Sequence, residues 1–409
     1  MNQRRQFKIL QITRQKFPPE IRVAKEGLSF HEAGYQSAVL CPPMEGQEEH
    51  EIWEGIEIFR PSCLRSRSFF DKLASECVFF SPAWFKAIRN TIKTYEPDVL
   101  HVHDIWLGRV TLAASGAKKI VTDLHENMPA AVIEYRKGYR SFHRLFRYIF
   151  HNQPRILSYE RHVLQKSDLV LCVVKEARDR VIENHQVLNS DSVVNVENLE
   201  SKRFISNPNS GKRYFGKDHI SVLYIGGFGP HRGIDTLIRA MVLIREKNLN
   251  YKVQIVGAKS SQYLGYLKEL IHELQVEDYV QITGWVPTED VHANIQQADI
   301  CCVPHHSNPH TDSTIPHKLF QYMIARKPVL VSSSRPLART VDQAQAGLVF
   351  EAGNPADCAE KIISLGSDSD KRAEFADNGI CYVMQEGHNW EDESAPILIE
   401  AFDRLVGLS

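Results

Sequence analysis

Short apolar segments alternate with amphipathic segments along almost the whole chain, and this alternation limits the available folds more than any other feature. In the first half, six runs rich in β-branched and apolar residues predict strands: 7–12, 36–41, 98–102, 119–124, 169–174 and 193–196. Helical periodicity falls between most of these runs: 23–33, 83–95, 107–117 and 175–184. The second half repeats the plan, with six more predicted strands: 221–227, 251–257, 279–284, 299–304, 328–333 and 347–350. Buried strands that alternate with helices predict an α/β fold of doubly wound, Rossmann-like parallel sheets.

The length predicts two domains. A chain of 409 residues exceeds what one hydrophobic core usually supports. The polar stretch 201–218, rich in Gly, Pro, Asn and Ser, predicts a linker between an N-terminal domain (1–200) and a C-terminal domain (219–389), and an amphipathic helix is expected within 390–409. Ligands bind at the carboxyl ends of the strands in such folds, so tandem domains with an interdomain cleft would suit a two-substrate reaction.

Composition narrows the class of protein. The net charge of −1 argues against a protein that coats nucleic acid. No run approaches the roughly 18 apolar residues of a membrane span, and the charged first residues lead directly into a predicted strand, so we expect a cytoplasmic location. The eight cysteines form no C-x-x-C pair and lie mostly in apolar contexts, which predicts reduced thiols and no zinc site.

One segment departs from the balanced average. Between residues 136 and 166, eight basic residues face a single acidic one, Glu160, and aromatic and aliphatic residues are interleaved with them. Such a mixture is typical of a basic amphipathic helix on an anionic membrane, which would place the protein at the inner membrane face. The other interpretation, left open by the sequence, is a solvated helix face that covers the core.

The segment from Thr311 to Ser333 predicts an anion site. Asp312, Ser313 and Thr314 offer hydroxyls and a helix cap, Pro316 suits a first helical turn, and Lys318 adds positive charge. The apolar positions that follow have helical spacing and would leave Lys318, Gln321 and Tyr322 shared between a cleft and the surface. An ordinary capped helix before a core strand remains the alternative.

The sequence of the glycine-rich loop 226–233 distinguishes a dinucleotide cofactor from a diphosphate ligand. A dinucleotide fingerprint that starts at Gly227 would need a glycine where Arg232 stands, and the strand 251–257 ends without the expected ribose-binding acid. A nicotinamide oxidoreductase is therefore disfavoured. A glycine turn followed by a guanidinium instead predicts a diphosphate site, with a glycine-rich turn and a surface arginine as the alternative.

These motifs together resemble the retaining glycosyltransferases of family 4 (glycosyl transferases group 1), which have the two-Rossmann architecture called GT-B. The resemblance covers nearly the whole chain. It rests on the order of six segments: PPEIRVAKEGLSFHEAGY (18–35), PDVLHVHDIW (97–106), KIVTDLHENMP (119–129), VLYIGGFGPHRGIDTLIRA (222–240), VQITGWVPTEDV (280–291) and ADICCVPHHSN (298–308).

The resemblance implies roles for individual residues. His125 would contact the donor sugar near the reaction centre, and Arg232 and Lys318 would stabilise the leaving diphosphate without a metal or other cofactor. The implied donor-binding residues are Gly227, Gly229, Arg232, Gly284, Asp312, Thr314, Ile315, Lys318 and Gln321. The implied acceptor-binding residues are Arg22, His103, Asp104 and Glu126. The final helix would pack back on the N-terminal domain.

Two family features are missing from this sequence. Members commonly carry two glutamates separated by seven residues, and those places fall on Ser313 and Gln321. Gln321 can still accept a hydrogen bond from a ribose hydroxyl, and Asp312 could replace the first glutamate. The phosphate loop often has an arginine where Gly227 stands and a lysine where Arg232 stands, so we expect donor affinity to be lower than usual or to rest on other contacts.

The implied activity is a metal-independent, retaining hexosyl transfer. The donor would be a nucleotide-diphosphate sugar, and the acceptor a saccharide or lipid-linked saccharide in cell-surface polysaccharide synthesis. Two alternatives remain open at this stage: a nucleotide-sugar epimerase of the same fold, and a non-catalytic protein that binds nucleotide sugars.

Overall fold

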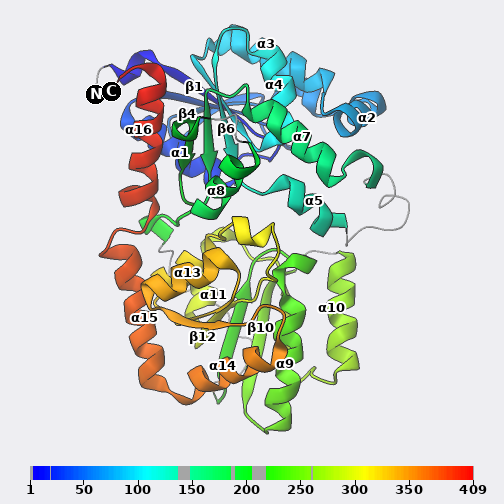
Figure 1. The fold of residues 1–409 in the computed structure, drawn as a ribbon, viewed down its shortest axis with the longest axis vertical. Coiled ribbons are helices and arrows are strands. Elements are labelled where there is room, and N and C mark those ends of the chain that lie inside the picture. The colour runs from blue at the N-terminus through cyan, green and yellow to red at the C-terminus, as the bar shows by residue number, and fades with distance from the viewer. Residues whose placement is uncertain are drawn as a thin grey trace. The chain divides into compact units, whose positions relative to one another are not determined.

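A computed structural model describes residues 3–18, 20–136, 148–185, 189–204, 218–258 and 261–408, which fold into two compact units (Figure 1). The first unit comprises Met1–Ile133, Ser141–Asn198 and Ser394–Ser409, and the second comprises Glu134–Arg140 and Leu199–Glu393. Most of the expected linker 201–218 lies outside the described residues. Each unit holds a doubly wound sheet, so the predicted fold class is confirmed.

The first unit is built on an eight-stranded sheet in the order β3-β4-β2-β1-β5-β6-β7-β8. Its strands are β1 Lys8–Ile12, β2 Gln36–Leu40, β3 His50–Trp53, β4 Ile56–Phe59, β5 Val99–His103, β6 Lys119–Leu124, β7 Leu169–Cys172 and β8 Val193–Asn195. All neighbours pair in parallel except β3 with β4. All six predicted strands are present, whereas the β3–β4 hairpin was not predicted because its residues alternate with polar ones at the edge of the sheet.

The helices of this unit lie between its strands and follow the last of them. They are α1 Ile21–Ala33, α2 Phe69–Val78, α3 Pro82–Tyr95, α4 Gly108–Ala114, α5 Met128–Arg136, α7 Gln153–Leu164, α8 Lys175–Asn184 and α16 Ala395–Val406. The last three residues of α5, Glu134 to Arg136, are grouped in the second unit. The helix predicted over 107–117 is shorter, because a 3-10 turn, Ile105–Leu107, precedes it.

Helix α1 shows how local sequence positions part of the site. It begins where the Glu20 side chain accepts a hydrogen bond from the Val23 N–H, and it ends at Gly34, whose φ of 100° favours glycine. Its buried face includes Arg22 and, one turn later, Glu26. Helix α16 packs beside α1, with the rings of Phe30 and Phe402 4.5 Å apart (Figure 1).

The second unit is built on a six-stranded parallel sheet in the order β11-β10-β9-β12-β13-β14. Its strands are β9 Ile220–Ile225, β10 Tyr251–Ala258, β11 Val280–Gly284, β12 Ile300–Val303, β13 Val329–Ser332 and β14 Gly347–Phe350. Its helices are α9 Ile234–Glu246, α10 Gln262–Glu273, α11 Thr288–Gln296, α12 Lys318–Ile324, α13 Arg335–Ala344, α14 Pro355–Ser367 and α15 Ser369–Met384. All six predicted strands of this half are present.

The segment after Thr311 differs from its prediction. Residues Thr311–Ser313 form a 3-10 turn, and helix α12 begins only at Lys318, with no side-chain cap. The Ser313 hydroxyl donates back to the Pro309 carbonyl at 2.8 Å, so it is unavailable as a cap. All seven residues of α12 are buried, because the helix packs against β13 and α15. The expectation that Lys318, Gln321 and Tyr322 would be shared with the surface is therefore wrong.

The C-terminal segment also differs in detail. The helix expected within 390–406 is preceded by a π-helical turn, Trp390–Ser394, and its α-helical part starts at Ala395. The eight cysteines are free thiols, and five of them are buried, as their apolar contexts predict.

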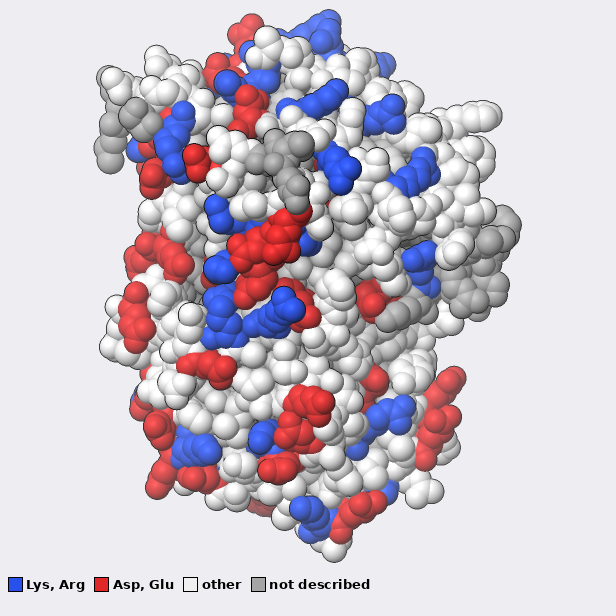
Figure 2. Space-filling model, in the orientation of Figure 1, with Lys and Arg blue, Asp and Glu red and all other residues white. Residues whose placement is uncertain are grey.

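The described surface agrees with the near-zero net charge. Figure 2 shows basic and acidic side chains mixed over the face that it presents. Within the described ranges, no helix is both long enough and apolar enough to cross a membrane.

Candidate active site

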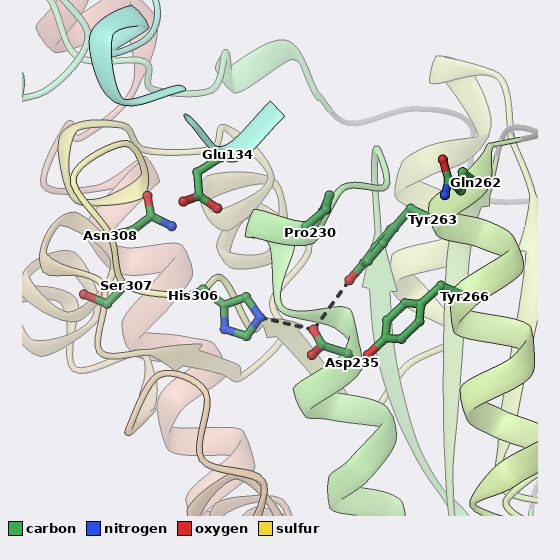
Figure 3. Close-up of a pocket in the computed structure, with 9 residues that line it drawn as sticks. All are labelled: Glu134, Pro230, Asp235, Gln262, Tyr263, Tyr266, His306, Ser307 and Asn308. Atoms are coloured by element: carbon green, nitrogen blue, oxygen red, sulfur yellow. Dashed lines mark hydrogen bonds and ion pairs between the residues drawn. The ribbon is translucent and has the colours of Figure 1, made fainter. Parts of the chain in front are cut away.

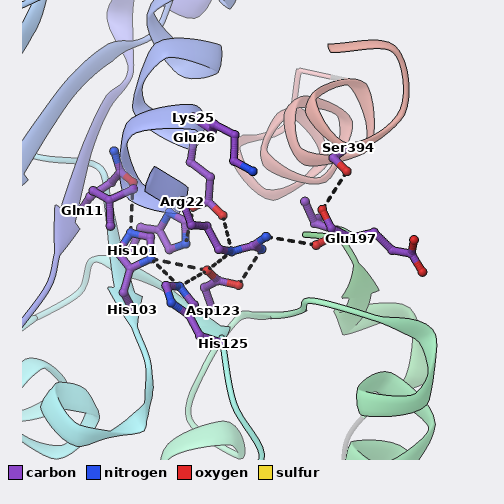
Figure 4. A network of polar contacts seen from close by, with 12 residues as sticks. Gln11, Arg22, Lys25, Glu26, His101, His103, Asp123, His125, Glu197 and Ser394 are labelled. Carbon is purple, nitrogen blue, oxygen red and sulfur yellow. Dashed lines mark hydrogen bonds and ion pairs between the residues drawn. The ribbon is translucent and has the colours of Figure 1, made fainter. Parts of the chain in front are cut away.

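His125 belongs to a buried polar network in the first unit that is centred on Asp123 (Figure 4). It follows β6 directly, and its Nε2 lies 2.7 Å from Oδ2 of Asp123, which is on the same strand. Arg22 of α1 donates to both oxygens of that carboxylate, at 2.8 and 2.9 Å. His103, at the end of the neighbouring strand β5, places Nδ1 3.0 Å from Nε2 of His125. The parallel sheet thus brings the ends of β5 and β6 together with one helix.

The network holds His125 as a cation. Burial opposes the charge, but the carboxylates of Asp123 and Asp104 outweigh it and raise the pKa of His125 to about 10. Burial likewise opposes the charge on Asp123, yet Arg22 and His125 hold the pKa of that carboxyl well below its usual range. His103 is different, because burial lowers its pKa and keeps its ring neutral.

Asp104 occupies a strained backbone conformation beside His125. Its φ is 61°, a region that costs a residue other than glycine about 1–3 kcal/mol and that clusters at functional sites. Its Oδ1 accepts a hydrogen bond from the His125 N–H at 3.1 Å, which fixes the backbone at the end of β6. Burial raises the pKa of Asp104 to about 6.

Four side chains of this network have the donor atoms of a metal site. Ligand atoms of Glu26, His101, His103 and Asp123 lie within 4.8 Å of one another. The guanidinium of Arg22, however, lies 3.0 Å from Glu26 and 2.8 Å from Asp123 and already supplies the positive charge. A divalent cation would be repelled by it, so the donor set fits a metal poorly. We assign the group as a buried ion-pair network.

In the second unit, the loop after β9 brings the backbone of Gly226 next to the buried side chain of Lys318. Gly226 has φ of 140°, and a Cβ atom there would lie 2.3 Å from Nζ of Lys318. Gly227 is different, since a Cβ atom at that position would meet nothing within 4 Å. Gly229 lies beside the His231 ring. Only glycine at position 226 therefore allows α12 and this loop to approach so closely.

Lys318 is a buried amine with no counter-ion among the described residues. Its side chain is 7% exposed, and Nζ has no hydrogen-bond partner among the described residues. The ammonium lies 4.0 Å from the centroid of the Tyr224 ring, a cation–π contact. Burial, followed by the charge of Arg232, holds the pKa of Lys318 well below its usual range. An anion would satisfy both cations and restore the ordinary pKa of the lysine.

Arg232 lies on the same loop. Its Nη1 is 3.3 Å from Nε2 of His305, whose pKa is held well below its usual range by burial and by Arg232. His231 is kept neutral in the same way, with a pKa of about 2. These histidines therefore add no charge, and Lys318 and Arg232 are the cations that the loop gathers.

A cavity of about 360 Å³ opens beside this loop. Its lining includes three glycines, and its other lining residues are Ile225, Phe228, Ser261, Trp285, Val286 and Val291. Trp285 directly follows β11, its side chain is 57% exposed, and it offers a flat aromatic face of the kind on which a nucleobase stacks. The sequence prediction named its neighbour Gly284 but missed this tryptophan, whose signal was an aromatic residue directly after a strand end.

Gln321 has an unexpected partner. Its Nε2 donates to Oε2 of Glu200 at 2.7 Å, and both side chains are buried. Glu200 also accepts from the N–H of Ser201 at 2.8 Å. A carboxylate therefore lies next to the position where the family glutamate is missing. The sequence offered no signal for it, because 121 residues separate the two.

The other residues predicted to bind donor or acceptor are engaged in bonds within their own unit or are buried. Asp312 accepts from the Ser307 hydroxyl at 2.9 Å and from the Arg335 N–H at 3.1 Å. The Thr314 hydroxyl donates to the His310 carbonyl at 3.4 Å, Ile315 is buried and Glu126 is half-buried. Arg22, predicted to bind acceptor, is buried with its guanidinium held by Asp123, which favours an orienting role.

Two sequence families match the chain in succession. "Glycosyltransferase Family 4" matches residues 21–194, and "Glycosyl transferases group 1" matches residues 208–380. The chain belongs to the family 4, group 1 glycosyltransferases. Enzymes of this family use nucleotide-sugar donors, and the predicted family and GT-B fold are thereby confirmed.

Individual relatives are distant. A GDP-mannose-dependent alpha-(1-6)-phosphatidylinositol monomannoside mannosyltransferase of Mycobacterium tuberculosis is 27% identical over 188 residues, which cover 46% of this chain and 48% of the relative. The matched regions thus span about half the length of the curated relatives. Among solved structures, sucrose-phosphate synthase of Thermosynechococcus elongatus has a TM-score of 0.81 at 17% identity, covering 98% of this chain and 100% of that one. The Anabaena protein HepE, in complex with UDP-glucose, has a TM-score of 0.70 at 14% identity, covering 98% and 100%.

Proposed function

We propose that this glycosyltransferase is a metal-independent, retaining hexosyltransferase whose second unit binds a nucleotide-diphosphate sugar. The buried ammonium of Lys318 carries this proposal. It has no hydrogen-bond partner among the described residues, and it lies against the glycine loop beside Arg232. Burying an unpaired charge costs several kcal/mol, so the site is suited to an anion that arrives with the substrate.

The chemistry required of such a site is modest. When the bond between the anomeric carbon and the diphosphate oxygen breaks, negative charge grows on the leaving diphosphate. Lys318 and Arg232 are fixed donors that can stabilise this charge, because they need not reorganise during the reaction. The cavity at Gly227 and Trp285 is the proposed place for the nucleoside. Glu200, held by Gln321, is a second proposed contact of the donor and lies outside the residues that line this cavity.

We propose that His125 contacts the donor sugar and that the residues around it orient its imidazole ring. Asp123 holds the imidazolium at 2.7 Å, and Arg22 holds Asp123. A cationic donor of this kind can bind a sugar hydroxyl or a phosphate oxygen. Asp104 and Glu126, at the ends of β5 and β6, remain the proposed acceptor contacts together with His103. Retention of configuration is proposed from family membership.

The acceptor is proposed to be a saccharide or a lipid-linked saccharide of a cell-surface polysaccharide, met at the inner membrane face. The predicted basic segment 136–166 lies in part, over 137–147, outside the described residues. Next to it, Tyr148 and Ile149 are 66% and 54% exposed. In the same unit, Phe69 and Phe70 of α2 are 73% and 78% exposed. Exposed aromatic side chains near basic ones support a peripheral membrane contact.

One titration series tests the donor proposal. Thermal unfolding is measured with UDP, GDP and ADP, and then with their glucose and mannose derivatives, without metal and with EDTA. We expect one nucleoside diphosphate to raise Tm in a concentration-dependent way, because ligand that binds only the folded state stabilises it. A matching sugar nucleotide should then release its diphosphate in a coupled assay. If no nucleoside diphosphate raises Tm, the proposal fails.

A non-catalytic sugar-nucleotide-binding protein is the second candidate, since Ser313 and Gln321 replace both family glutamates. Binding of donor without any transfer or hydrolysis would favour it over the enzyme. An epimerase would instead consume donor without acceptor.

A further inference from the structure

A second cavity is lined in part by Pro230 of the glycine loop and has a different chemistry (Figure 3). Its volume is about 530 Å³, and its lining is Glu134, Pro230, Asp235, Gln262, Tyr263, Tyr266, His306, Ser307 and Asn308. All nine residues belong to the second unit. The size is that of a small-molecule site.

The charges that line this cavity exclude phosphate. Glu134 and Asp235 carry carboxylates, and among the residues that the structure describes no lysine or arginine lines the cavity. Arg232 of the loop and Lys318 of α12 are likewise absent from the lining. An anionic ligand would therefore meet repulsion here, in contrast to the site at Lys318. An uncharged or cationic ligand fits these charges better than an anion does.

Asp235 is held as an ionised acceptor at the floor of the cavity. Nε2 of His306 lies 3.2 Å from its Oδ1, and the Tyr263 hydroxyl donates to the same oxygen at 3.4 Å. Burial opposes ionisation, but the bond to His306 outweighs it and lowers the pKa of Asp235. Both bonds end on Oδ1, so Oδ2 can still accept from a ligand hydroxyl.

Two tyrosines form one wall of the cavity. The rings of Tyr263 and Tyr266 on α10 are stacked, with centroids 5.7 Å apart and an angle of 29° between their planes. Tyr266 is 40% exposed. In Figure 3, the two rings and Gln262 lie on one side of the cavity, and Asn308 and Ser307 lie on the opposite side. Asp235 lies between them. A flat aromatic wall opposite amide, hydroxyl and carboxylate groups matches a ligand with an apolar ring face and many hydroxyls.

We propose that this cavity binds a neutral saccharide, and that it is a subsite for the sugar acceptor, separate from the donor's diphosphate. The acceptor role rests on the proposed glycosyl transfer. The loop 226–233 contributes to both cavities, with Gly226 and Gly227 lining one and Pro230 the other. A sugar held against Tyr266 would donate to Asp235 and Asn308 and exchange hydrogen bonds with Gln262. Uncharged sugars would be selected over uronic acids and sugar phosphates.

The test uses saturation-transfer NMR on the full chain with maltose, cellobiose and mannobiose, and with glucuronate and glucose 6-phosphate as charged probes. We expect at least one neutral disaccharide to receive saturation and both charged probes to bind at least about ten-fold more weakly. Tyr266→Ala and Asp235→Asn should each weaken the neutral sugar about ten-fold or more, whereas Tyr266→Phe should retain most of the stacking.

Two controls separate this inference from the donor proposal. Glu269→Ala lies on α10 outside the cavity and should leave sugar binding unchanged. Nucleoside diphosphate binding, measured in parallel, should be unchanged in Tyr266→Ala and Asp235→Asn. Unchanged nucleotide binding would also show that both variants fold. Sugar binding without nucleotide binding would defeat the donor proposal and leave the saccharide site standing. Saturation of no neutral disaccharide, or equal saturation in parent and both variants, would overturn the saccharide site.

Discussion

Nε2 of Gln321 donates a hydrogen bond to Oε2 of Glu200 at 2.7 Å, and both side chains are about 95% buried. The donor is on α12, and the acceptor is on the segment that follows β8. This bond shows how the site can retain a carboxylate although residue 321 is an amide. It also makes the protein sensitive to the substitution Gln321→Glu, although this substitution restores the residue that the family commonly has at that position.

Gln321→Glu should destabilise the protein in a pH-dependent way. It would place two carboxyl groups within hydrogen-bond distance, so one of them acquires a raised pKa in the folded state. A raised carboxyl pKa means that the folded form binds a proton that the unfolded form releases, and stability falls as pH rises. We expect a loss of about 2–4 kcal/mol at pH 8 and a smaller loss at pH 5, measured by urea unfolding.

The reciprocal variant Glu200→Gln/Gln321→Glu is the matched control for that experiment. It exchanges donor and acceptor and should recover most of the lost stability. Equal stability of the Gln321→Glu variant and the parent at pH 8 would contradict the bond.

Lys318→Met should separate binding from stability. Removing a buried, uncompensated charge and filling its space with an apolar side chain should leave the free energy of unfolding equal or higher without ligand. Turnover, once a donor is found, should fall by about one to three orders of magnitude in Lys318→Met, and likewise in Arg232→Ala. Lys268→Met, an exposed lysine on α10, is the control. Unchanged turnover in both site variants would remove these cations from the mechanism.

His125 should contribute to stability only at lower pH. Its folded-state pKa is about 10, above the unfolded value of about 6.5. The stabilisation is therefore fully present below about pH 6.5 and is lost as pH rises towards 10. We expect the difference in unfolding free energy between parent and His125→Gln to be on the order of a few kcal/mol at pH 6 and to shrink by pH 10. The exposed His272→Gln should stay within about 0.5 kcal/mol at all pH values. A pH-independent difference for His125→Gln would show that His125 is not held as a cation.

The order of the elements could be read from the sequence, whereas several contacts of the site could not. All twelve predicted strands exist because each is a buried run whose period does not depend on distant residues. Lys318 was found because charge and glycine spacing are local. Glu200 and the Asp235–His306 pair were missed, since their partners lie 121 and 71 residues away and neither sits in a recognisable pattern. The cap expected before α12 failed because the hydroxyl of Ser313 bonds to the backbone of its own loop.

Gly227→Arg should strengthen binding of a nucleoside diphosphate. A Cβ atom at this position meets nothing within 4 Å, and the residue lines the cavity next to the loop. A guanidinium there would add a third cation and could bind phosphate oxygens in a bidentate manner. We expect a gain of about ten-fold in affinity by calorimetry. Gly265→Arg, which adds the same charge at an equally open position on α10, should show no gain. Equal affinity of Gly227→Arg and the parent would place the diphosphate elsewhere.

Exposed aromatic residues of the first unit should mediate membrane binding. Phe69 and Phe70 begin α2 and are 73% and 78% exposed, and burying one such ring in a bilayer interface is worth about 1.5–3 kcal/mol. We expect Phe69→Ser/Phe70→Ser to reduce flotation with phosphatidylserine-containing vesicles at least about ten-fold. Ile52→Ser, at an exposed apolar residue of β3, is the matched control.

The basic component of this binding is tested with the same vesicles. Neutralising Arg140, Arg144 and Arg147, which lie outside the described residues, should weaken binding and reduce its dependence on salt. Loss in the aromatic variant alone would mean that α2 inserts without electrostatic attraction, because the apolar and ionic contributions act independently at a bilayer surface. Equal flotation of the parent, the aromatic variant and the arginine variant would remove the membrane from this enzyme's partners and leave a saccharide free in solution as its acceptor.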